Sequence, residues 1–162
     1  MTFERKYIGT EQAFRKIKHY CAYAERSHSE TKQKLYSFGL FKNEVELLMS
    51  QLVEENYLNE ERYAIAFAGG HFRMKQWGRT KIKYELKLKG VSEYCIKKAL
   101  AAIPAEDYQQ TFQKLAETKL RDLKGEQNIF TKKKKLQNYL AGKGYEFEMI
   151  ALFLNGVGGN KW

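Results

Sequence analysis

The spacing Leu-x3-Gly occurs three times in this chain and constrains the fold more than any other feature. It falls at residues 35–39, 86–90 and 140–144, so the glycines are 51 and 54 positions apart. Six residues after each glycine stands a β-branched aliphatic, and ten residues after it a large apolar residue; these are Val45, Ile96, Ile150 and Met49, Leu100, Leu154. Three matches in phase predict an internal repeat of about fifty residues.

Each repeat is predicted to hold three helices. The first helices are expected at residues 11–27, 60–76 and 106–124, the middle ones at 30–38, 79–89 and 132–142, and the third ones at 43–56, 93–103 and 147–154. Ser29, Asn59 and Ser92 precede helical patterns, and each offers a side-chain oxygen to the unpaired N–H groups of a first turn. The three repeated glycines suit helix C-termini that need a left-handed residue.

These elements predict an all-α chain of three tandem repeats. The expected divisions are an N-terminal tail at 1–9, repeats at 10–56, 57–103 and 104–155, and a C-terminal tail at 156–162. Pro104 separates the second repeat from the third, because the residue before a proline disfavours helix. Gly69 and Gly70 conflict with this pattern, since a glycine inside a helix costs roughly 1 kcal/mol relative to alanine. Either the helix bends there or another chain approaches closely.

Composition narrows the functional class. No apolar run approaches the roughly 18 residues that a membrane span requires, and "MTFERKYIGT" lacks the apolar core of a signal peptide. We therefore expect a soluble cytoplasmic protein. Cys21 and Cys95 lie in apolar helical patterns and are expected to be small core residues. The chain has no nucleotide-binding, zinc-protease or serine-hydrolase motif and no Cys/His cluster, so neither an enzyme nor a cofactor is predicted.

The formal net charge of +10 is unevenly distributed along the sequence. A first basic zone contains Arg73, Lys75, Arg79, Lys81, Lys83, Lys87 and Lys89 with one acid, Glu85. A second contains Lys132, Lys133, Lys134, Lys135 and Lys143 and no acid. Residues 42–61 instead carry Glu44, Glu46, Glu54, Glu55, Glu60 and Glu61. Basic stripes beside an acidic zone are typical of proteins that touch nucleic acid or a protein–nucleic-acid assembly.

The turn at Gly90 also has the outline of a DNA-reading helix-turn-helix. Its second helix should then carry the groups that read base edges, yet that helix has only Lys97 and Lys98 as basic residues. Arg79, Lys83 and Lys87 lie instead at i, i+4 and i+8 of the preceding helix. This stripe is better suited to following a polyanion than to reading bases, and a merely solvated lysine face is the alternative.

Three stretches of the chain resemble the RecX regulatory proteins of bacteria. They are "YAERSHSETKQKLYSFG", "ENYLNEERYAIAF" and "GRTKIKYELKLKGV". The positions that match the family pattern are Arg26 and Ser29; Tyr57, Leu58, Glu60, Arg62, Tyr63 and Ala64; and Gly78, Ile82, Glu85, Leu86, Lys89 and Gly90. The chain departs from the pattern at His28, where arginine is usual, at Asn59 and Glu60, where aspartates are common, and at the Gly69–Gly70 pair.

The resemblance implies a curved, elongated array of three three-helix repeats that acts as a monomer in DNA repair, homologous recombination and the SOS response. Proteins of this family bind the RecA recombinase filament on DNA and restrain its ATPase, strand-exchange and co-protease activities. Nucleic-acid or filament contacts are then expected at Arg26, Arg73, Lys75, Arg79, Lys81, Lys83, Lys87, Lys89, Lys132, Lys133, Lys134 and Lys135. Partner-protein contacts are expected at Glu44, Glu46 and Arg62. Two alternatives are a non-specific nucleic-acid-binding helical protein without a recombinase partner, and a protein scaffold that binds no nucleic acid.

Overall fold

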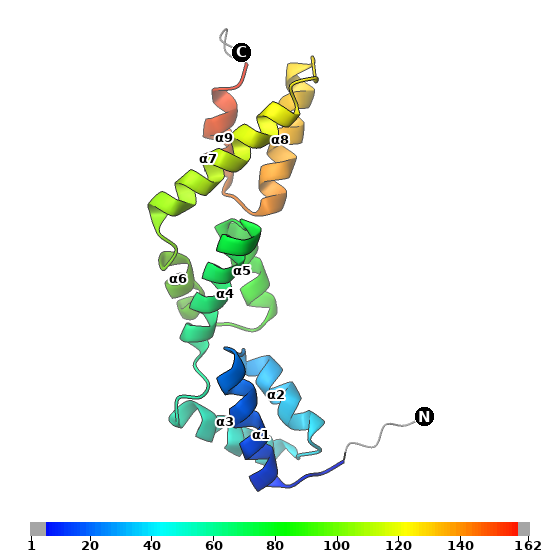
Figure 1. The fold of residues 1–162 in the computed structure, drawn as a ribbon, viewed down its shortest axis with the longest axis vertical. Coiled ribbons are helices and arrows are strands. Elements are labelled where there is room, and N and C mark those ends of the chain that lie inside the picture. The colour runs from blue at the N-terminus through cyan, green and yellow to red at the C-terminus, as the bar shows by residue number, and fades with distance from the viewer. Residues whose placement is uncertain (1–5, 159–162) are drawn as a thin grey trace, which may run out of the picture. The chain divides into compact units, whose positions relative to one another are not determined.

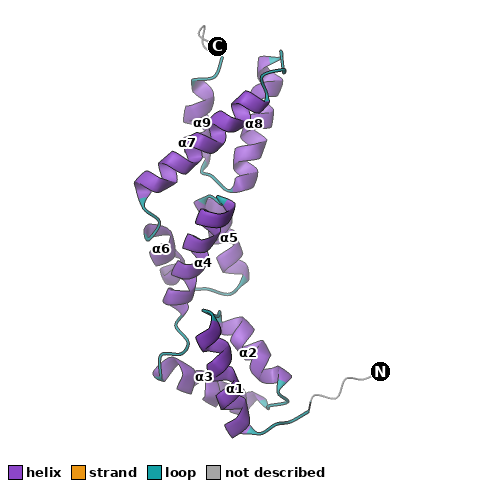
Figure 2. Cartoon of the chain, viewed as in Figure 1, coloured by secondary structure: helices purple, strands orange, loops and turns teal. Residues whose placement is uncertain are grey.

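The computed structural model describes residues 6–158, and within this range the chain forms helices and no strands (Figures 1 and 2). The helices are α1 (Thr10–Tyr23), α2 (His28–Ser37), α3 (Lys42–Glu54), α4 (Glu60–Lys75), α5 (Arg79–Leu88), α6 (Glu93–Ala101), α7 (Ala105–Asp122), α8 (Ile129–Lys143) and α9 (Phe147–Asn155). All nine predicted helices are confirmed. The predicted tails, 1–9 and 156–162, lie partly outside the described residues. None of the described helices is long and apolar enough to cross a membrane.

The start of α2 differs from the prediction. Ser27, not Ser29, caps this helix: its Oγ accepts from the Glu30 N–H at 3.1 Å, and the Glu30 carboxylate accepts from the Ser27 N–H at 2.6 Å. This reciprocal pair is a capping box, which satisfies two backbone donors at once. The backbone is already extended at Ala24, with φ −158° and ψ 155°, so α1 ends at Tyr23, earlier than predicted.

Side chains also cap the starts of three other helices. The Asn59 side chain accepts from the Arg62 N–H at 2.8 Å, and the Ser92 hydroxyl accepts from the Cys95 N–H at 3.3 Å, as predicted. The helix α8 begins at Ile129, three residues before the predicted start. Sequence reasoning missed its cap, Asn128, whose side chain accepts from the N–H groups of the next turn.

The repeat is visible in burial and in backbone conformation. Leu35, Leu86 and Leu140 each have 0% of their surface exposed. The glycines that follow them, Gly39, Gly90 and Gly144, have φ angles of 83°, 77° and 98°. Each repeated leucine thus fills a core, and each repeated glycine supplies the left-handed residue that ends its helix.

The described chain divides into two compact units. Unit 1 comprises residues up to 67 together with 86–98, and unit 2 comprises 68–85 together with residues from 99 onward. The division runs through α4, α5 and α6. It does not follow the predicted repeat boundaries, which stay predictions.

In unit 1, α1, α2 and α3 pack against one another. Their shared core consists of Ala13, Ile17, Cys21, Leu35, Leu40, Val45, Leu48, Met49, Leu52 and Leu58. Both cysteines are buried and free, as predicted. Burial raises the pKa of the Cys21 thiol, which keeps it protonated and unreactive within the core.

In unit 2, α8 packs against both α7 and α9. An aromatic cluster joins the elements: the Phe72 ring at the end of α4 lies 5.8 Å from the Tyr108 ring of α7, centroid to centroid. Tyr145, between α8 and α9, lies 5.3 Å from both Tyr108 and Phe112. These rings are packing residues, and they bring the end of α4 and the start of α9 onto α7.

The Gly69–Gly70 pair does not interrupt α4. A Cβ built on Gly70 would meet no atom within 4 Å, whereas one built on Gly69 would lie 2.7 Å from a guanidinium nitrogen of Arg73. The space at Gly69 is therefore occupied by a side chain of the same helix, one turn further along.

Candidate nucleic-acid and protein interface

A tight contact in unit 2, here called the glycine junction, joins Gly78 at the start of α5 to Gly144 at the end of α8. The Gly78 N–H donates to the Lys143 carbonyl at 2.8 Å, and the Thr80 N–H donates to the Gly144 carbonyl at 2.9 Å. A Cβ on Gly78 would lie 2.3 Å from the Gly144 oxygen, and one on Gly144 would lie 2.3 Å from the Lys81 Cβ. Both positions therefore exclude any side chain.

Two further hydrogen bonds hold the end of α4 at the same place. The Tyr145 hydroxyl donates to the Gln76 carbonyl at 2.9 Å, and the Lys143 ammonium donates to the Lys75 carbonyl at 3.2 Å. Gln76 has a φ of 54°, a left-handed conformation that a residue with a Cβ adopts at a cost. The end of α4 is thus fixed by groups that follow it in the chain by nearly seventy residues.

Arg79, the first residue of the predicted α5 stripe, is part of this junction. Its guanidinium donates to the Glu146 carboxylate at 2.8 Å and lies 3.8 Å from the centre of the Tyr108 ring. The Tyr108 hydroxyl accepts from the Arg79 N–H at 3.0 Å and donates to Glu146. Burial, and then the hydrogen bond to Glu146, raise the pKa of Tyr108 and keep it a donor. The structure places Arg79 in an internal ion pair.

The remaining predicted residues of the first basic zone differ in exposure. Lys83 is exposed and forms no ion pair within residues 6–158. The Lys87 ammonium lies 3.9 Å from the Glu93 carboxylate, at the limit of an ion pair. Lys75 and Lys81 place their ammonium groups 5.3 and 4.7 Å from the centre of the Trp77 ring. Lys89 is half-buried.

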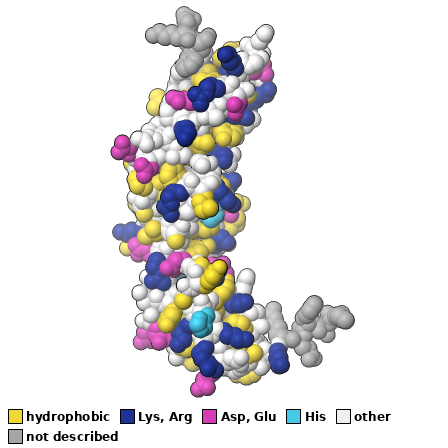
Figure 3. Space-filling model, viewed as in Figure 1, with side chains coloured by type: hydrophobic (Ala, Val, Ile, Leu, Met, Phe, Trp, Pro, Cys, Tyr) yellow, Lys and Arg dark blue, Asp and Glu magenta, His cyan; other side chains and the backbone are white. Residues whose placement is uncertain are grey.

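The second basic zone lies on α8. Lys134 and Lys135 are exposed, and Lys132 and Lys133 are half-buried. The Lys135 ammonium pairs with the Glu126 carboxylate at 3.1 Å, and this hydrogen bond is the main cause that lowers the pKa of Glu126. Among the described residues the other three lysines of the run form no ion pair. In the face shown in Figure 3, basic side chains are interspersed with acidic and hydrophobic ones.

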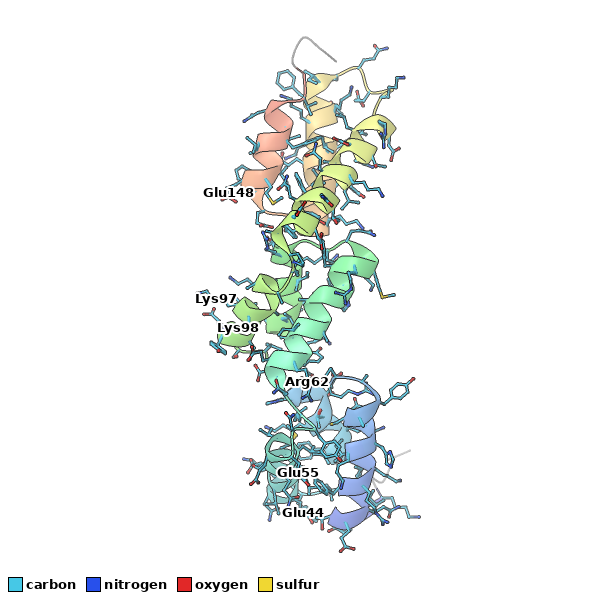
Figure 4. All side chains as sticks on the ribbon, turned by 60° about the vertical axis from the view of Figure 1, so that its left-hand side comes forward. Glu44, Glu55, Arg62, Lys97, Lys98 and Glu148 are labelled. Atoms are coloured by element: carbon cyan, nitrogen blue, oxygen red, sulfur yellow. The ribbon has the colours of Figure 1, made fainter. Side chains whose placement is uncertain are left out.

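Two predicted contact residues of unit 1 are arginines with internal partners. The Arg26 Nε donates to the Tyr20 carbonyl at 3.0 Å, and its guanidinium lies 3.9 Å from the centre of the Tyr20 ring. Arg62, at the start of α4 (Figure 4), pairs with Glu25 and donates to the Asn56 side-chain and backbone oxygens at 3.2 and 3.1 Å. Arg62 therefore holds the turn at Asn56, whose φ is 63°.

The acidic zone forms part of α3. The two carboxylate oxygens of Glu44 accept from the Tyr7 hydroxyl at 2.8 Å and the Phe41 N–H at 2.9 Å, so Glu44 caps the helix. Glu46, Glu54 and Glu55 are exposed, and so are the apolar side chains Leu47 and Val53. A shallow groove of about 490 Å³ has His28 and Lys32 of α2 on one side and Glu46, Met49, Val53 and Glu54 of α3 on the other.

Sequence reasoning missed a second groove, of about 550 Å³, in unit 2. It lies between the end of α4, which supplies Phe72, Arg73 and Gln76, and α7, which supplies Thr111, Lys114 and Leu115 among others. Of the residues that line this groove, the sequence predicts only Arg73 as a contact residue. Lys114 lies outside both predicted basic zones, in a helix that carries acidic as well as basic residues. A usable signal was the helical spacing of Thr111, Lys114 and Thr118, which puts three polar groups on one face.

The sequence predicts no contact role for Lys97 and Lys98, yet both are exposed on α6 and point away from it in Figure 4. Within the described part of the chain, no group of three or more His, Cys, Asp or Glu side chains is placed to hold a metal ion. The candidate site is therefore a set of surfaces: exposed lysines on α5 and α8, an acidic and apolar face on α3, and two grooves.

Family models of two RecX domains match the chain. The second three-helix domain matches residues 59–100, and the third three-helix domain matches residues 106–154. These matched segments begin and end near the second and third predicted repeats.

Curated relatives agree with the family models. A "Regulatory protein RecX" of Clostridium perfringens is 36% identical over 124 residues, covering 76% of this chain and 58% of the relative. One from Clostridium tetani is 31% identical over 157 residues, covering 94% of this chain and 72% of the relative. The chain thus spans less than two thirds of the length of the Clostridium perfringens protein.

Solved structures show the same fold. The crystal structure of RecX from Lactobacillus salivarius matches with a TM-score of 0.80 at 20% identity, covering 91% of this chain and 96% of that one. A second crystal structure of a regulatory protein RecX matches with a TM-score of 0.79 at 21% identity, covering 91% and 71%.

Proposed function

This chain belongs to the RecX family of regulatory proteins, and from this premise we propose that it binds the RecA recombinase filament on DNA. In this proposal it inhibits the filament's ATPase, strand-exchange and co-protease activities, acting as a cytoplasmic monomer. The observation that carries the proposal is the exposed basic face of α5, where Lys83 has no ion pair among the described residues and Lys87 has only a weak one.

The proposed DNA contacts are lysines that have no ion pair among the described residues or, for Lys87, only the long one to Glu93. They are Lys83 and Lys87 on α5 and Lys132, Lys133 and Lys134 on α8. Each phosphate contact releases bound counterions from DNA, so this part of the binding should weaken as salt rises. Arg26 and Arg79 leave the proposed set, because their guanidinium groups already have partners inside the protein.

The proposed recombinase contact is the outer face of α3. Glu46 and Glu54 are exposed there beside Leu47 and Val53, which have 58% and 49% of their surface exposed, and the exposed Glu55 follows the end of the helix. Apolar side chains supply the buried centre of a protein interface, and surrounding charges select the partner and speed its encounter. A basic surface of the recombinase would complement this face. Glu44 and Arg62 support the surface from within, since both are engaged in internal hydrogen bonds.

The experiment measures how the chain inhibits the ATPase activity of RecA filaments on single-stranded DNA across a range of salt. Replacing Lys83 and Lys87 together by glutamine is expected to weaken inhibition and flatten its dependence on salt. The matched control replaces Lys97 and Lys98, a pair with the same total charge on α6. Equal losses from the two pairs would refute a specific role for α5.

The other candidate is a nucleic-acid-binding protein without a recombinase partner, since exposed lysines alone suffice for that activity. A pull-down with and without nuclease separates the two functions. If RecA is retained only while DNA is intact, and the filament binds no better than bare single-stranded DNA, the second candidate is correct.

A further inference from the structure

The α4–α7 groove of unit 2 combines apolar, cationic and neutral polar side chains. Phe72 and Leu115 give it an apolar lining, Arg73 stands on the α4 side and Lys114 on the α7 side. Gln76, Thr111 and Thr118 add neutral hydrogen-bonding groups, and Asp107 adds one carboxylate. The groove therefore offers two cations and several donors around an apolar centre.

Neither cation of the groove is neutralised within the protein. Among the described residues Arg73 and Lys114 form no ion pair, and Asp107 pairs with neither of them. Arg26, Arg62 and Arg79, in contrast, all have internal partners. A guanidinium presents a planar fork that binds two oxygens of a phosphate, and an ammonium adds a point charge. The groove thus keeps a net positive charge with free donors.

Gly69 explains how Arg73 reaches its position. The Arg73 side chain turns back along α4, and its guanidinium occupies the space where a Cβ on Gly69 would stand. Long helical side chains usually lie over the preceding turn, where a Cβ is normally present. Gly70 has open space around it and needs no such explanation. Gly69, the first glycine of the pair, leaves the space that the Arg73 guanidinium occupies.

The surroundings of the groove favour nucleic acid over an acidic protein. Trp77 follows Gln76 in the chain, is partly exposed, and carries the ammonium groups of Lys75 and Lys81 near its ring. The Trp77 ring is itself stacked on His71, with 4.5 Å between the ring centroids. The ring therefore positions the two lysines, and their positive charge near the groove attracts the phosphates of a nucleic-acid strand. Successive phosphates of one strand can meet these lysines and the two cations of the groove together.

We propose that the α4–α7 groove is a phosphodiester-binding site for single-stranded DNA. Arg73 and Lys114 contact phosphates in this site, and Gly69 leaves the space that the Arg73 side chain needs. This site rests on the proposed DNA contact of the chain and adds to it a location outside the α5 stripe. Asp107 restricts where a phosphate can bind in the groove, because its negative charge repels a phosphate placed beside it.

The test measures binding of the full chain, without RecA, to a fluorescently labelled oligothymidylate at several salt concentrations. Arg73→Gln and Lys114→Gln are each expected to lower affinity roughly five- to tenfold. Each should also reduce the slope of log affinity against log salt by about the amount that one phosphate contact contributes. Gly69→Ala should lower affinity by a similar factor because the new methyl group displaces the guanidinium. Gly70→Ala is the matched control and should bind like the unaltered chain.

Folding is followed by thermal unfolding of the same variants. Both glycine substitutions should raise Tm, because alanine favours helix, so a loss of affinity confined to Gly69→Ala cannot come from unfolding. Equal affinities of the two glycine variants, or unchanged affinity of Arg73→Gln and Lys114→Gln, would overturn the site.

Two outcomes separate this inference from the proposed function. If Lys83→Gln with Lys87→Gln weakens DNA binding while the groove variants do not, the groove proposal fails and the proposed function stands. If the groove variants change inhibition of RecA but not binding to oligothymidylate, the groove holds an acidic protein surface and the phosphodiester proposal is wrong.

Discussion

The glycine junction and the α4–α7 groove lie in the same unit and start from the same basic stretch of sequence, yet they use their arginines in opposite ways. At the junction, Arg79 meets the Glu146 carboxylate at 2.8 Å and stacks on Tyr108. In the groove, Arg73 stands on the α4 side and Asp107 on the α7 side, and Arg73 forms no ion pair among the described residues. A basic residue is therefore structural or free according to which carboxylates the fold brings to it.

The largest expected effect is on the junction itself. Gly78→Ala should lower the free energy of unfolding by about 3 kcal/mol, because the added methyl group would overlap backbone atoms of Gly144 and Tyr145, which cannot turn aside as a flexible side chain can. Urea denaturation measures the loss. Gly142→Ala is the control: its Cβ meets nothing within 4 Å, and alanine should stabilise α8 by up to about 1 kcal/mol. Similar stabilities of the two variants would show that the junction is not tightly packed.

The two arginines should differ next. Arg79→Gln is expected to cost about 2 kcal/mol, because it leaves the half-buried Glu146 carboxylate without its charged donor. Arg73→Gln should change stability by less than about 0.5 kcal/mol, as surface substitutions usually do. Equilibrium unfolding of both variants in one buffer makes the comparison. If the two losses are equal, the distinction between a structural and a free arginine fails.

A smaller effect is expected where the two sites meet at Gln76. Tyr145→Phe removes the hydroxyl that donates to the Gln76 carbonyl and should lower stability by about 1 kcal/mol. Tyr139→Phe is the control, because the Tyr139 hydroxyl donates no hydrogen bond to a described residue. Thermal unfolding measures both variants. If Tyr145→Phe loses no more stability than Tyr139→Phe, the Tyr145 hydroxyl does not hold the turn at Gln76.

The helices could be predicted because their determinants are local. The spacing of Leu35, Leu86 and Leu140 predicted buried positions, and Asn59 and Ser92 predicted two helix starts. The errors were also local: a serine two residues earlier, Ser27, forms the capping box of α2, and Asn128 starts α8 sooner than the lysine run suggested. Competing cap residues within one turn are hard to rank from sequence, since the choice depends on which backbone N–H groups each side chain can reach.

The contact surfaces were less predictable. Arg26 and Arg62 match the RecX pattern and Arg79 belongs to the basic stripe, and all three have internal partners. Lys114 matched no basic pattern and lines a groove without an ion pair among the described residues. Counting charges along the chain cannot distinguish these cases, because each outcome depends on a carboxylate or carbonyl supplied by another element.

By itself, then, the sequence determined the helical repeat and the residues that fill its cores, because hydrophobic spacing and the conformational freedom of glycine act over one or two turns. The tertiary structure decided which cations face solvent. Arg79 and Glu146 are 67 positions apart, and only folding brings them within the short range at which an ion pair forms. Folding also placed Arg73, beside Gly69, opposite Lys114 of α7, so the groove is formed by residues that lie far apart in the sequence.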